Sequence, residues 1–557
     1  MRGAVSAAGG PRLTGLDPFP RMIYWEIDEP LPARAASRVP GPALRWDRGT
    51  FGMRTRGITR RAGNRPARSG LGGTSVGRRV GLLRGEARKI LRLAGPIVLS
   101  QLGVVGMTTT DTLMVGRLGP TALAAVGVGS AIHFFALVVS MGLVLGTGPL
   151  ISQAFGAGRA DECRSLVVQG AWVALAASIP AIWVSLMGER AALLLGQEPE
   201  VAAVAGAYMR TLAPGVPGWM LFMAFRQYLE GMGRPTPPTA ITLLGLVINA
   251  IADWVLIYGV DGIIPAYGPV GAGWATTVVR LAMLAAAVAY LAKQPGLWPV
   301  RRGDRIAPRP ALLRRIVVVG APIGGQLGLE VGLFSFGATI MMGWLGAVQL
   351  AAHQIAINLA STTFMVALGT SLAGQIRVGH HIGARHPAGA QRAALTTYAL
   401  SVGFMGLCGL VFLTFPAALV GLYTEAPEVL RLGATLLLFA AAFQVFDGSQ
   451  VAGLCILRGA ADTAVPMLFA GLGYWGVGLP AAYLLGFRTP LGATGIWAGL
   501  SLALAVVAAL LALRVRHVLW RRAVHGDLAR AGVRRRGRVV DPVQTVGPIA
   551  QRERTEW

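Results

Sequence analysis

The feature that most constrains this chain is a series of long apolar runs between residues 93 and 513. A helix needs about 20 predominantly apolar residues to cross the hydrocarbon core of a bilayer, and a dozen runs reach that length. They are predicted at residues 93–116, 122–149, 165–187, 201–230, 238–260, 270–293, 314–344, 349–376, 394–417, 430–456, 465–486 and 492–514. Since 54% of the residues are hydrophobic and 14% are charged, we predict an all-α integral membrane protein with twelve transmembrane helices.

Positive charge is unevenly distributed along the chain. The formal net charge is +26, but Lys and Arg are concentrated in the two tails and in alternate connections between the apolar runs. Such an excess marks the cytoplasmic side of a membrane protein. We therefore expect a multi-pass protein of the bacterial inner (plasma) membrane with both termini in the cytoplasm, whose partner is the lipid bilayer and not a nucleic acid.

The chain also repeats itself, which predicts two homologous six-helix lobes. Residues 116–125 recur as residues 343–352 with the pattern Gly-x-Leu-Gly-x-x-x-Leu-Ala-Ala, and the Gly-Ala pair at 156–157 recurs at 383–384. Because each half has an even number of helices, both enter the membrane in the same sense, a parallel repeat typical of transporters. The predicted domains are a basic, disordered N-terminal extension at 1–85, an N-terminal lobe at 86–293, a cytoplasmic linker at 294–313, a C-terminal lobe at 314–516 and a basic cytoplasmic tail at 517–557.

Prolines and glycines mark two features of the first helix of each half. Pro96 and Pro322 occupy matching positions inside these helices, where a proline removes a backbone hydrogen bond. Each is a candidate hinge, and a fixed bend is the alternative. In the second of these helices glycine recurs every fourth residue, which favours close helix packing. These glycines are Gly320, Gly324, Gly328 and Gly332.

Four acids fall inside predicted spans, where they are costly: Asp111, Asp253, Glu330 and Asp447. An ionised carboxylate at the centre of a membrane helix costs at least about 2.5–3.5 kcal/mol, so such an acid faces a partner or an aqueous cavity. We therefore take all four as candidates for ion coupling and substrate binding. For Asp111 and Asp253, which lie near the ends of their spans, simple exposure at the membrane interface is the alternative.

Amide side chains accompany these acids at helical spacing. Asn249 lies one helical turn before Asp253, so the two share a face and could hydrogen-bond Asp111. Gln444 and Gln450 lie on either side of Asp447. Carboxylate and amide oxygens are the hard ligands that suit a small cation, so Glu330 and Asp447 are candidates for holding Na⁺.

Other polar residues in the spans favour structural roles. His133 and His353 could exchange protons, but a hydrogen-bonded packing histidine is the commoner case. Arg280 is expected to reach the membrane interface or to pair with an acid. Arg226 lies one turn before Glu230, which predicts an ion pair within that helix.

Taken together, these residues resemble the multidrug and toxic compound extrusion (MATE) transporters over residues 90–515. The resemblance rests on motifs that are individually loose but specific in their order, namely Asp111-Thr112 with Gly116-x-x-Gly119, Gln153-x-x-Gly156-Ala157, Glu230-Gly231-x-Gly233, Asn249-x-x-x-Asp253, Pro322 followed by Glu330, His353-Gln354, Val378-Gly379, and Gln444-x-x-Asp447-x-x-Gln450 leading to Leu457-Arg458-Gly459. It implies two lobes arranged as a V around a central cavity that opens alternately to each side of the membrane. It also implies that Glu330 and Asp447 match the cation-binding acids of the NorM-type branch, and that Asp111 matches the coupling acid of the first helix.

Two departures from the NorM-type pattern leave the coupling ion open between Na⁺ and H⁺. Asp253 stands where NorM-type members commonly carry asparagine, which is closer to the DinF-type branch, and Phe443 stands where a tyrosine could help to ligate a cation. With either ion, the expected function is secondary active antiport, in which cationic or amphiphilic drugs and toxic organic compounds leave the cell as the ion enters.

The rival interpretations are a flippase of lipid-linked oligosaccharides from the same superfamily and a membrane-embedded enzyme. Acidic residues in the spans favour cationic cargo over the pyrophosphate of such lipids. The chain contains no HExxH, GxSxG or GxxxxGK[ST] motif, so it is not expected to be an enzyme or to carry a cofactor. We expect a monomer. The substrate range stays open, and so does the choice between a mobile extension at 1–85 and a start codon placed upstream of the true one.

Overall fold

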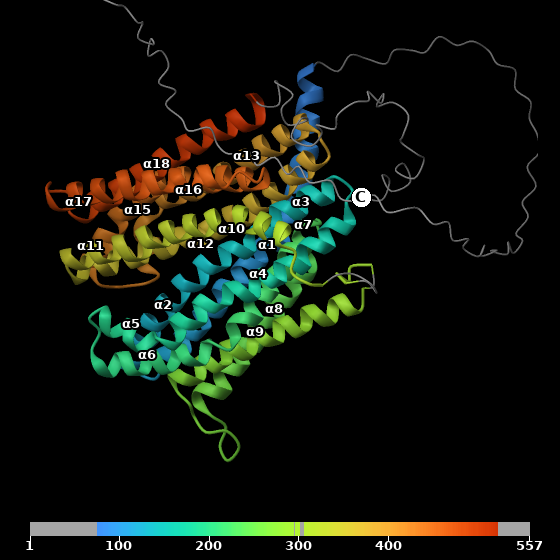
Figure 1. Cartoon of the computed structure of the whole chain (residues 1–557). Coiled ribbons are helices and arrows are strands. Elements are labelled where there is room, and N and C mark those ends of the chain that lie inside the picture. Colours follow the sequence, from blue (N-terminus) through green and yellow to red (C-terminus); the bar gives the residue numbers. More distant parts are fainter. Residues whose placement is uncertain (1–74, 295, 301–305, 522–557) are drawn as a thin grey trace, which may run out of the picture. The chain divides into compact units, whose positions relative to one another are not determined.

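Long helices make up most of the computed structural model, which describes residues 75–294, 296–300 and 306–521 (Figure 1). We call the helices before residue 294 the N half: α1 Ser75–Gly116, α2 Pro120–Leu145, α3 Thr147–Gly156, α4 Ala160–Leu186, α5 Gly188–Leu194, α6 Pro199–Leu212, α7 Gly215–Gly231, α8 Thr236–Tyr258 and α9 Pro269–Ala292. We call the later ones the C half: α10 Pro310–Val331, η1 Gly332–Gly337, α11 Ala338–Leu345, α12 Ala347–Gly383, α13 Pro387–Thr414, α14 Pro416–Gly421, α15 Pro427–Gly459, α16 Ala464–Ala470, η2 Gly471–Gly478, α17 Leu479–Phe487, α18 Ala493–Arg516 and η3 His517–Arg521.

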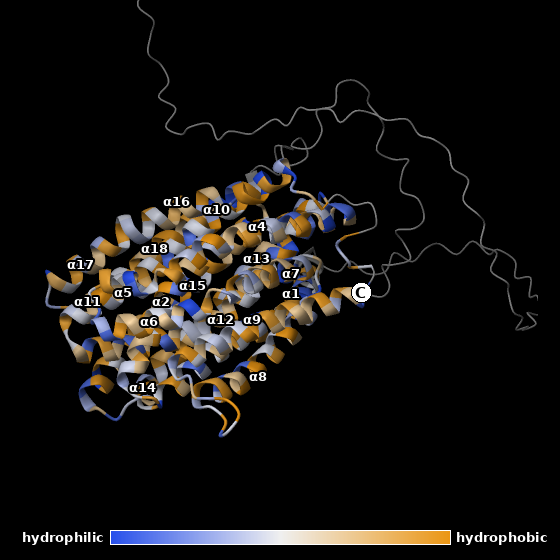
Figure 2. Ribbon diagram, turned by 60° about the horizontal axis from the view of Figure 1, so that its bottom comes forward, coloured by the Kyte–Doolittle hydropathy of each residue, from blue (hydrophilic) through white to orange (hydrophobic). Residues whose placement is uncertain are grey.

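The helices confirm the predicted all-α membrane fold. In the described part of the chain, 11 helices are long and apolar enough to cross a membrane. The predicted span 201–230 is formed instead by α6 and α7, which have 14 and 17 residues and are separated at Ala213 and Pro214. Pro214 has no amide hydrogen with which to continue the helical ladder. Figure 2 shows apolar residues along the length of the long helices, such as α8 and α9.

Helix ends differ in part from the prediction. Helix α1 begins at Ser75, well before the predicted span, and runs to Gly116. Residues 1–74 and 522–557, which hold most of the predicted extension and tail, lie outside the described residues, as do 295 and 301–305 of the predicted linker.

The repeated Gly-x-Leu-Gly motif forms the same tight turn in both halves. Gly119 has φ of 111° between α1 and α2, and Gly346 has φ of 130° between α11 and α12. A residue with a β-carbon rarely adopts these angles, so glycine is needed at both turns. The helix that follows each turn begins at once, at Pro120 or Ala347.

The first helix of each half packs across onto the other half. The N-terminal part of α1 buries Ile90, Ala94 and Ile97 against Ala373 and Ile376 of α12. In the same way, α10 packs against α2 and α4 of the N half. Because the first helix of each half packs against the other half in the same way, the interface between the halves is pseudo-twofold symmetric.

The glycine stripe of α10 serves this packing, as predicted. A β-carbon on Gly320 would meet the backbone of Leu143 in α2, and one on Gly324 would meet the carbonyl oxygen of Val139. A β-carbon on Gly328 would lie 3.0 Å from the side chain of Val139. Three of the four glycines therefore let α10 lie directly against α2.

Pro96 and Pro322 lie inside α1 and α10, and both helices continue past them. Their role as hinges stays a prediction. Beyond Pro322, α10 passes into the π-helical segment η1, and a second π-helical segment, η2, interrupts the span formed by α16 and α17. Phe334 of η1 and Tyr474 of η2 pack edge to face with ring centroids 5.8 Å apart. Such π segments are frequent at functional sites.

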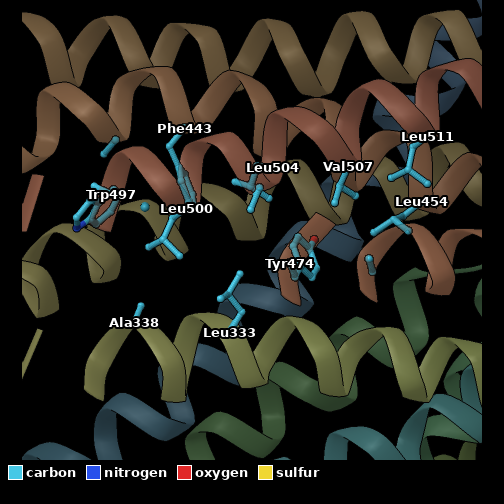
Figure 3. Close-up of a cluster of buried hydrophobic side chains, with 14 of the residues drawn as sticks. Leu333, Ala338, Phe443, Leu454, Tyr474, Trp497, Leu500, Leu504, Val507 and Leu511 are labelled. Carbon is cyan, nitrogen blue, oxygen red and sulfur yellow. The ribbon is translucent and has the colours of Figure 1, made fainter. Parts of the chain in front are cut away.

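The C half has one large apolar core. Figure 3 shows Phe443 of α15 and Tyr474 of η2 beside a row of side chains from α18. This row consists of Leu500, Leu504, Val507 and Leu511, spaced three or four residues apart. The core holds η2 and α15 in place, and both carry candidate functional residues.

Candidate functional site

The three polar residues predicted to meet in the N half do so. Asn249 Nδ2 of α8 donates a hydrogen bond to Asp111 Oδ1 of α1 at 2.9 Å. Asp253 lies one turn further along α8, is 0% exposed, and neither of its carboxylate oxygens has a hydrogen-bond partner among the described residues. Its charge interacts with that of Asp111. We call Asp111, Asn249 and Asp253 the N cluster.

Two side chains that sequence reasoning did not assign to this cluster face it. Tyr208 of α6 is 4% exposed and interacts electrostatically with both acids of the N cluster. Arg280 of α9 interacts with Asp111 and Tyr208. Its hydrogen-bond partner is His133, not an acid as one of our alternatives expected. For Arg280, the sequence did give a signal, namely a charged residue inside the sixth predicted span.

The second pair of acids lies in the C half, close enough for their charges to interact. Glu330 is the penultimate residue of α10, just before η1, and its charge interacts with that of Asp447 of α15, which is 7% exposed. Gln326 Nε2 donates to Glu330 Oε2 at 2.6 Å, and Arg458 donates to the oxygen of the same amide. The amide of Gln326 therefore joins Glu330 to a buried guanidinium. We call Glu330, Asp447, Gln326 and Arg458 the C cluster.

The two amides predicted around Asp447, Gln444 and Gln450, are buried, and only their nitrogen atoms have hydrogen-bond partners. Gln450 Nε2 donates to the phenol oxygen of Tyr474 at 2.7 Å, and Gln444 Nε2 donates to Thr363 Oγ1 of α12. The carbonyl oxygens of both amides are buried and have no hydrogen-bond partner among the described residues. A buried acceptor without a donor is costly, so these two oxygens are suited to a ligand that the protein itself does not supply.

Tyr474 supplies the phenol that the sequence lacks at position 443. It is fully buried, and it interacts electrostatically with Glu330 and Asp447. Phe443, by contrast, packs against Trp497 at 5.5 Å between ring centroids. The sequence analysis missed Tyr474 because the residues of η2 around it are apolar or glycine and give no sign of a polar site.

The donor set of the C half fits a small monovalent cation better than a transition metal. It offers two carboxylates, amide oxygens and a phenol, all hard oxygen ligands. In the described part of the chain, no group of three or more His, Cys, Asp or Glu side chains could hold a metal ion. A cation here would be transported cargo and not a resident cofactor.

The remaining polar residues of the spans contact groups outside the predicted acid pairs. Arg226 Nε pairs with Glu230 Oε1 at 2.6 Å within α7, as predicted, and Arg226 also donates to Gln101 of α1 at 2.7 Å. His133 is hydrogen-bonded to Ser185 at 2.9 Å, in keeping with a packing histidine. His353 is fully buried without a hydrogen-bond partner among the described residues and packs edge to face on Trp497.

A set of hydrogen bonds joins the two halves at the end of the bundle predicted to be cytoplasmic. Gln153 Nε2 of α3 donates to the carbonyl oxygen of Gly459 at 3.0 Å, and His380 Nε2 of α12 is hydrogen-bonded to the carbonyl oxygen of Gly231 at 2.7 Å. The two bonds occupy corresponding positions of the repeat. We call this contact region the junction.

An ion pair reinforces the junction. Arg377 of α12 bonds both carboxylate oxygens of Glu86 in α1, at 2.7 and 3.1 Å. The Glu86 side chain is 7% exposed and the Arg377 side chain is 16% exposed. Bidentate pairs of this kind are the stronger class of charged hydrogen bond, so the halves are firmly joined at this end.

Comparison with known proteins follows the same two-part division. The MatE family model matches residues 96–255 and 327–484. The chain is 41% identical over 445 residues to the probable multidrug resistance protein NorM of Mesorhizobium japonicum, covering 78% of this chain and 94% of that protein. It is 38% identical over 456 residues to the protein of the same name from Pseudomonas putida, covering 81% and 97%.

Solved structures of MATE transporters share the fold. The eukaryotic MATE transporter AtDTX14 superposes with a TM-score of 0.73 at 20% identity, covering 81% of this chain and 100% of that one. The bent form of the Vibrio cholerae MATE transporter VcmN superposes with a TM-score of 0.70 at 18% identity, covering 80% and 99%. With the family model matching more than half of its residues, the chain belongs to the MatE family and is a membrane transporter, not an enzyme.

Proposed function

We propose that this protein is a secondary active antiporter that exports cationic or amphiphilic drugs and toxic organic compounds in exchange for inward Na⁺ or H⁺. The observation that carries the proposal is the presence of two separate acidic clusters, one in each half. Each half also has polar oxygen atoms that are buried without a partner among the described residues: those of Asp253 in the N cluster, and those of Gln444 and Gln450, which flank Asp447 on α15, in the C half. The names of the two NorM relatives, which refer to multidrug resistance, support export of drugs.

The acids account for both the driving ion and the preferred cargo. Entry of one monovalent cation releases about 2.3 kcal/mol per 100 mV of membrane potential. Binding of that cation at Glu330 and Asp447, or at Asp111 and Asp253, neutralises buried charge and so changes the relative free energies of two arrangements of the halves. A cationic substrate competes for the same carboxylates. These carboxylates also disfavour the pyrophosphate-bearing lipids of a flippase.

The junction indicates which arrangement is present. We propose that the two halves act as two six-helix lobes in a bacterial inner membrane, with both termini cytoplasmic. The lobes are then joined at their cytoplasmic end through Glu86, Arg377, Gln153 and His380. This is the arrangement expected for a transporter closed toward the cytoplasm, and the inward-open state requires these bonds to break.

The direct test is export by purified protein in liposomes under Na⁺ and H⁺ gradients imposed separately. We expect one of the two gradients to drive export of a cationic dye. Glu330→Gln and Asp447→Asn should each lower the rate severely. Glu425→Gln, at an exposed loop position, is the matched control and should export at the wild-type rate. Normal export by the two C-cluster variants would mean that these acids do not couple transport.

A further inference from the structure

A glutamine amide links the acid of α10 to a buried arginine of α15. Gln326 Nε2 donates to Glu330 Oε2 at 2.6 Å, and Arg458 Nη2 donates to Gln326 Oε1. Gln326 is 2% exposed and Arg458 is 7% exposed, so water competes little for either bond. One buried amide therefore joins two groups of opposite charge.

Arg458 is also next to the carbonyl group that joins the two halves. It is the penultimate residue of α15, and the carbonyl oxygen of the next residue, Gly459, accepts from Gln153 Nε2 of the N half at 3.0 Å. The end of α15 has little free space, since a β-carbon on Gly459 would lie 2.6 Å from the carbonyl oxygen of Gln375 in α12. A shift of the main chain at Arg458 therefore acts on the bond between Gly459 and Gln153.

The N half has a similar link that does not include an acid of the N cluster. Arg226 Nη2 of α7 donates to Gln101 Oε1 of α1 at 2.7 Å. Helix α7 ends at Gly231, whose carbonyl oxygen is bonded to His380 of the other half. In both halves an arginine thus ties the first helix to the helix whose last glycine joins the halves, but Arg226 is paired with Glu230 of its own helix at 2.6 Å. Of the two links, only the one in the C half ends on a candidate coupling acid.

The other charged or titratable groups around Glu330 do not lead to the junction. The groups that interact with it are Asp447, Cys455 and Arg458 of α15 and Tyr474 of η2. Of these four, Arg458 alone is a cation, and it alone is adjacent in sequence to a residue that bonds the N half. The charge of Glu330 can therefore reach the junction by way of Arg458.

We propose that Arg458 is a positioning residue that couples the charge of Glu330 to the junction. An ionised Glu330 polarises the Gln326 amide, which makes the amide oxygen a better acceptor for Arg458. A proton or Na⁺ on Glu330 removes this polarisation, so the bond weakens and the end of α15 is held less firmly. Ion uptake then favours an open cytoplasmic end, as an antiporter requires of its ion-loaded state. The inference rests on the proposed antiport and deepens it.

The test measures how the ion changes the opening of the junction. Spin labels on Ala160→Cys and Ala388→Cys, two exposed positions just beyond the ends of α3 and α12, report the distance between the halves in a chain whose native cysteines are replaced by alanine. Double electron–electron resonance is recorded in liposomes at alkaline pH with and without saturating NaCl, and at acidic pH without Na⁺. We expect one of the two ions to raise the open-to-closed ratio of this parent chain by about fivefold, the difference between a charge-assisted and a neutral hydrogen bond.

Arg458→Gln should abolish this response, so that the ratio is the same with and without the ion. The variant keeps the bond between Gln326 and Glu330, and loss of a nearby cation favours ion uptake at Glu330, so a lost response does not reflect lost binding. Where Arg458→Gln does not yield folded protein, Gln326→Leu cuts the same link from its other side and should give the same result. Gln101→Leu cuts the corresponding link of the N half; it is the matched control and should keep the fivefold response.

Retention of the fivefold response in Arg458→Gln or Gln326→Leu would overturn the inference. Its loss in Gln101→Leu would do the same, because the response would then depend on helix packing in general. Export of a cationic dye is measured on each preparation. If the parent chain exports the dye but neither ion changes the ratio, coupling through the junction is excluded. If it neither responds nor exports, the proposed function fails, and the inference fails with it.

Discussion

Replacing Arg377 with glutamine should open the junction on its predicted cytoplasmic side. The arginine holds both carboxylate oxygens of Glu86 at 2.7 and 3.1 Å, and the variant leaves a carboxylate that is 7% exposed with His381, whose Nε2 lies 3.4 Å from Oε1, in place of the arginine. Loss of one partner of a buried, hydrogen-bonded charge pair between two surfaces costs about 2–5 kcal/mol. Because Arg377 keeps some contact with solvent, we use the lower figure of about 2 kcal/mol, which corresponds to a shift of about 30-fold in the equilibrium between joined and open halves.

A buried cysteine can report this shift. Ser152 of α3 is 0% exposed, and its β-carbon faces Gly379 across the junction. In a chain whose native cysteines, Cys163, Cys408 and Cys455, are replaced by alanine, a Ser152→Cys thiol reacts with a water-soluble maleimide only while the junction is open. We expect Arg377→Gln to raise its labelling rate by about 30-fold, as the equilibrium shift requires.

An exposed arginine elsewhere in the C half provides the control for Arg377→Gln. Arg431→Gln removes an exposed arginine at the N-terminal end of α15 and should leave labelling unchanged. If Arg377→Gln labels at the control rate while remaining monodisperse, the Glu86–Arg377 pair does not hold the halves together, and the assignment of the closed end is wrong.

Two further changes test the helix packing and the C cluster. Gly324→Leu places a side chain against the backbone of α2 and should lower the free energy of unfolding by about 1–3 kcal/mol, seen as a lower Tm in detergent, whereas Gly343→Leu, with open space around its β-carbon, should not. Tyr474→Phe removes the phenol that accepts from Gln450 and should raise the ion concentration for half-maximal export by about tenfold. Tyr483→Phe, at a side chain that is 42% exposed, is its control, and equal ion dependence in the two variants would exclude Tyr474 from the coupling site.

Local features of this protein were predictable because local composition determines them. Apolar length sets where a helix can cross the membrane, and the glycines at 119 and 346 mark turns whose φ is positive. The stripe from Gly320 to Gly328 predicted close packing, which the contacts with α2 confirm. The split of the fourth span into α6 and α7 was not predicted, although Pro214 was visible in the sequence.

Features that depend on contacts between distant helices were harder to predict. Gln326 could have been found from its spacing, since it lies one turn before Glu330 on the same face. Tyr474 could not, because its partners lie on other helices and only packing brings them together. Arg280 was marked by its charge, but its hydrogen-bond partner, His133 of α2, was not predictable for the same reason. The π-helical geometry of η1 and η2 likewise has no simple sequence period.

The two halves share a scaffold but not a pattern of charge. At the junction the repeat is closely kept, since Gln153 and His380 occupy corresponding positions and each bonds a glycine carbonyl oxygen of the opposite half. The acids keep this symmetry only in part. One acid of each half comes from its first helix, α1 or α10, but the second comes from α8 in the N half and from α15 in the C half, which are not corresponding helices. A perfectly repeated pair of sites would respond identically to every cation. Because the two clusters differ in geometry and in the arginine that faces them, one can respond to the driving ion while the other responds to the substrate, and the shared junction is the element that both can bias.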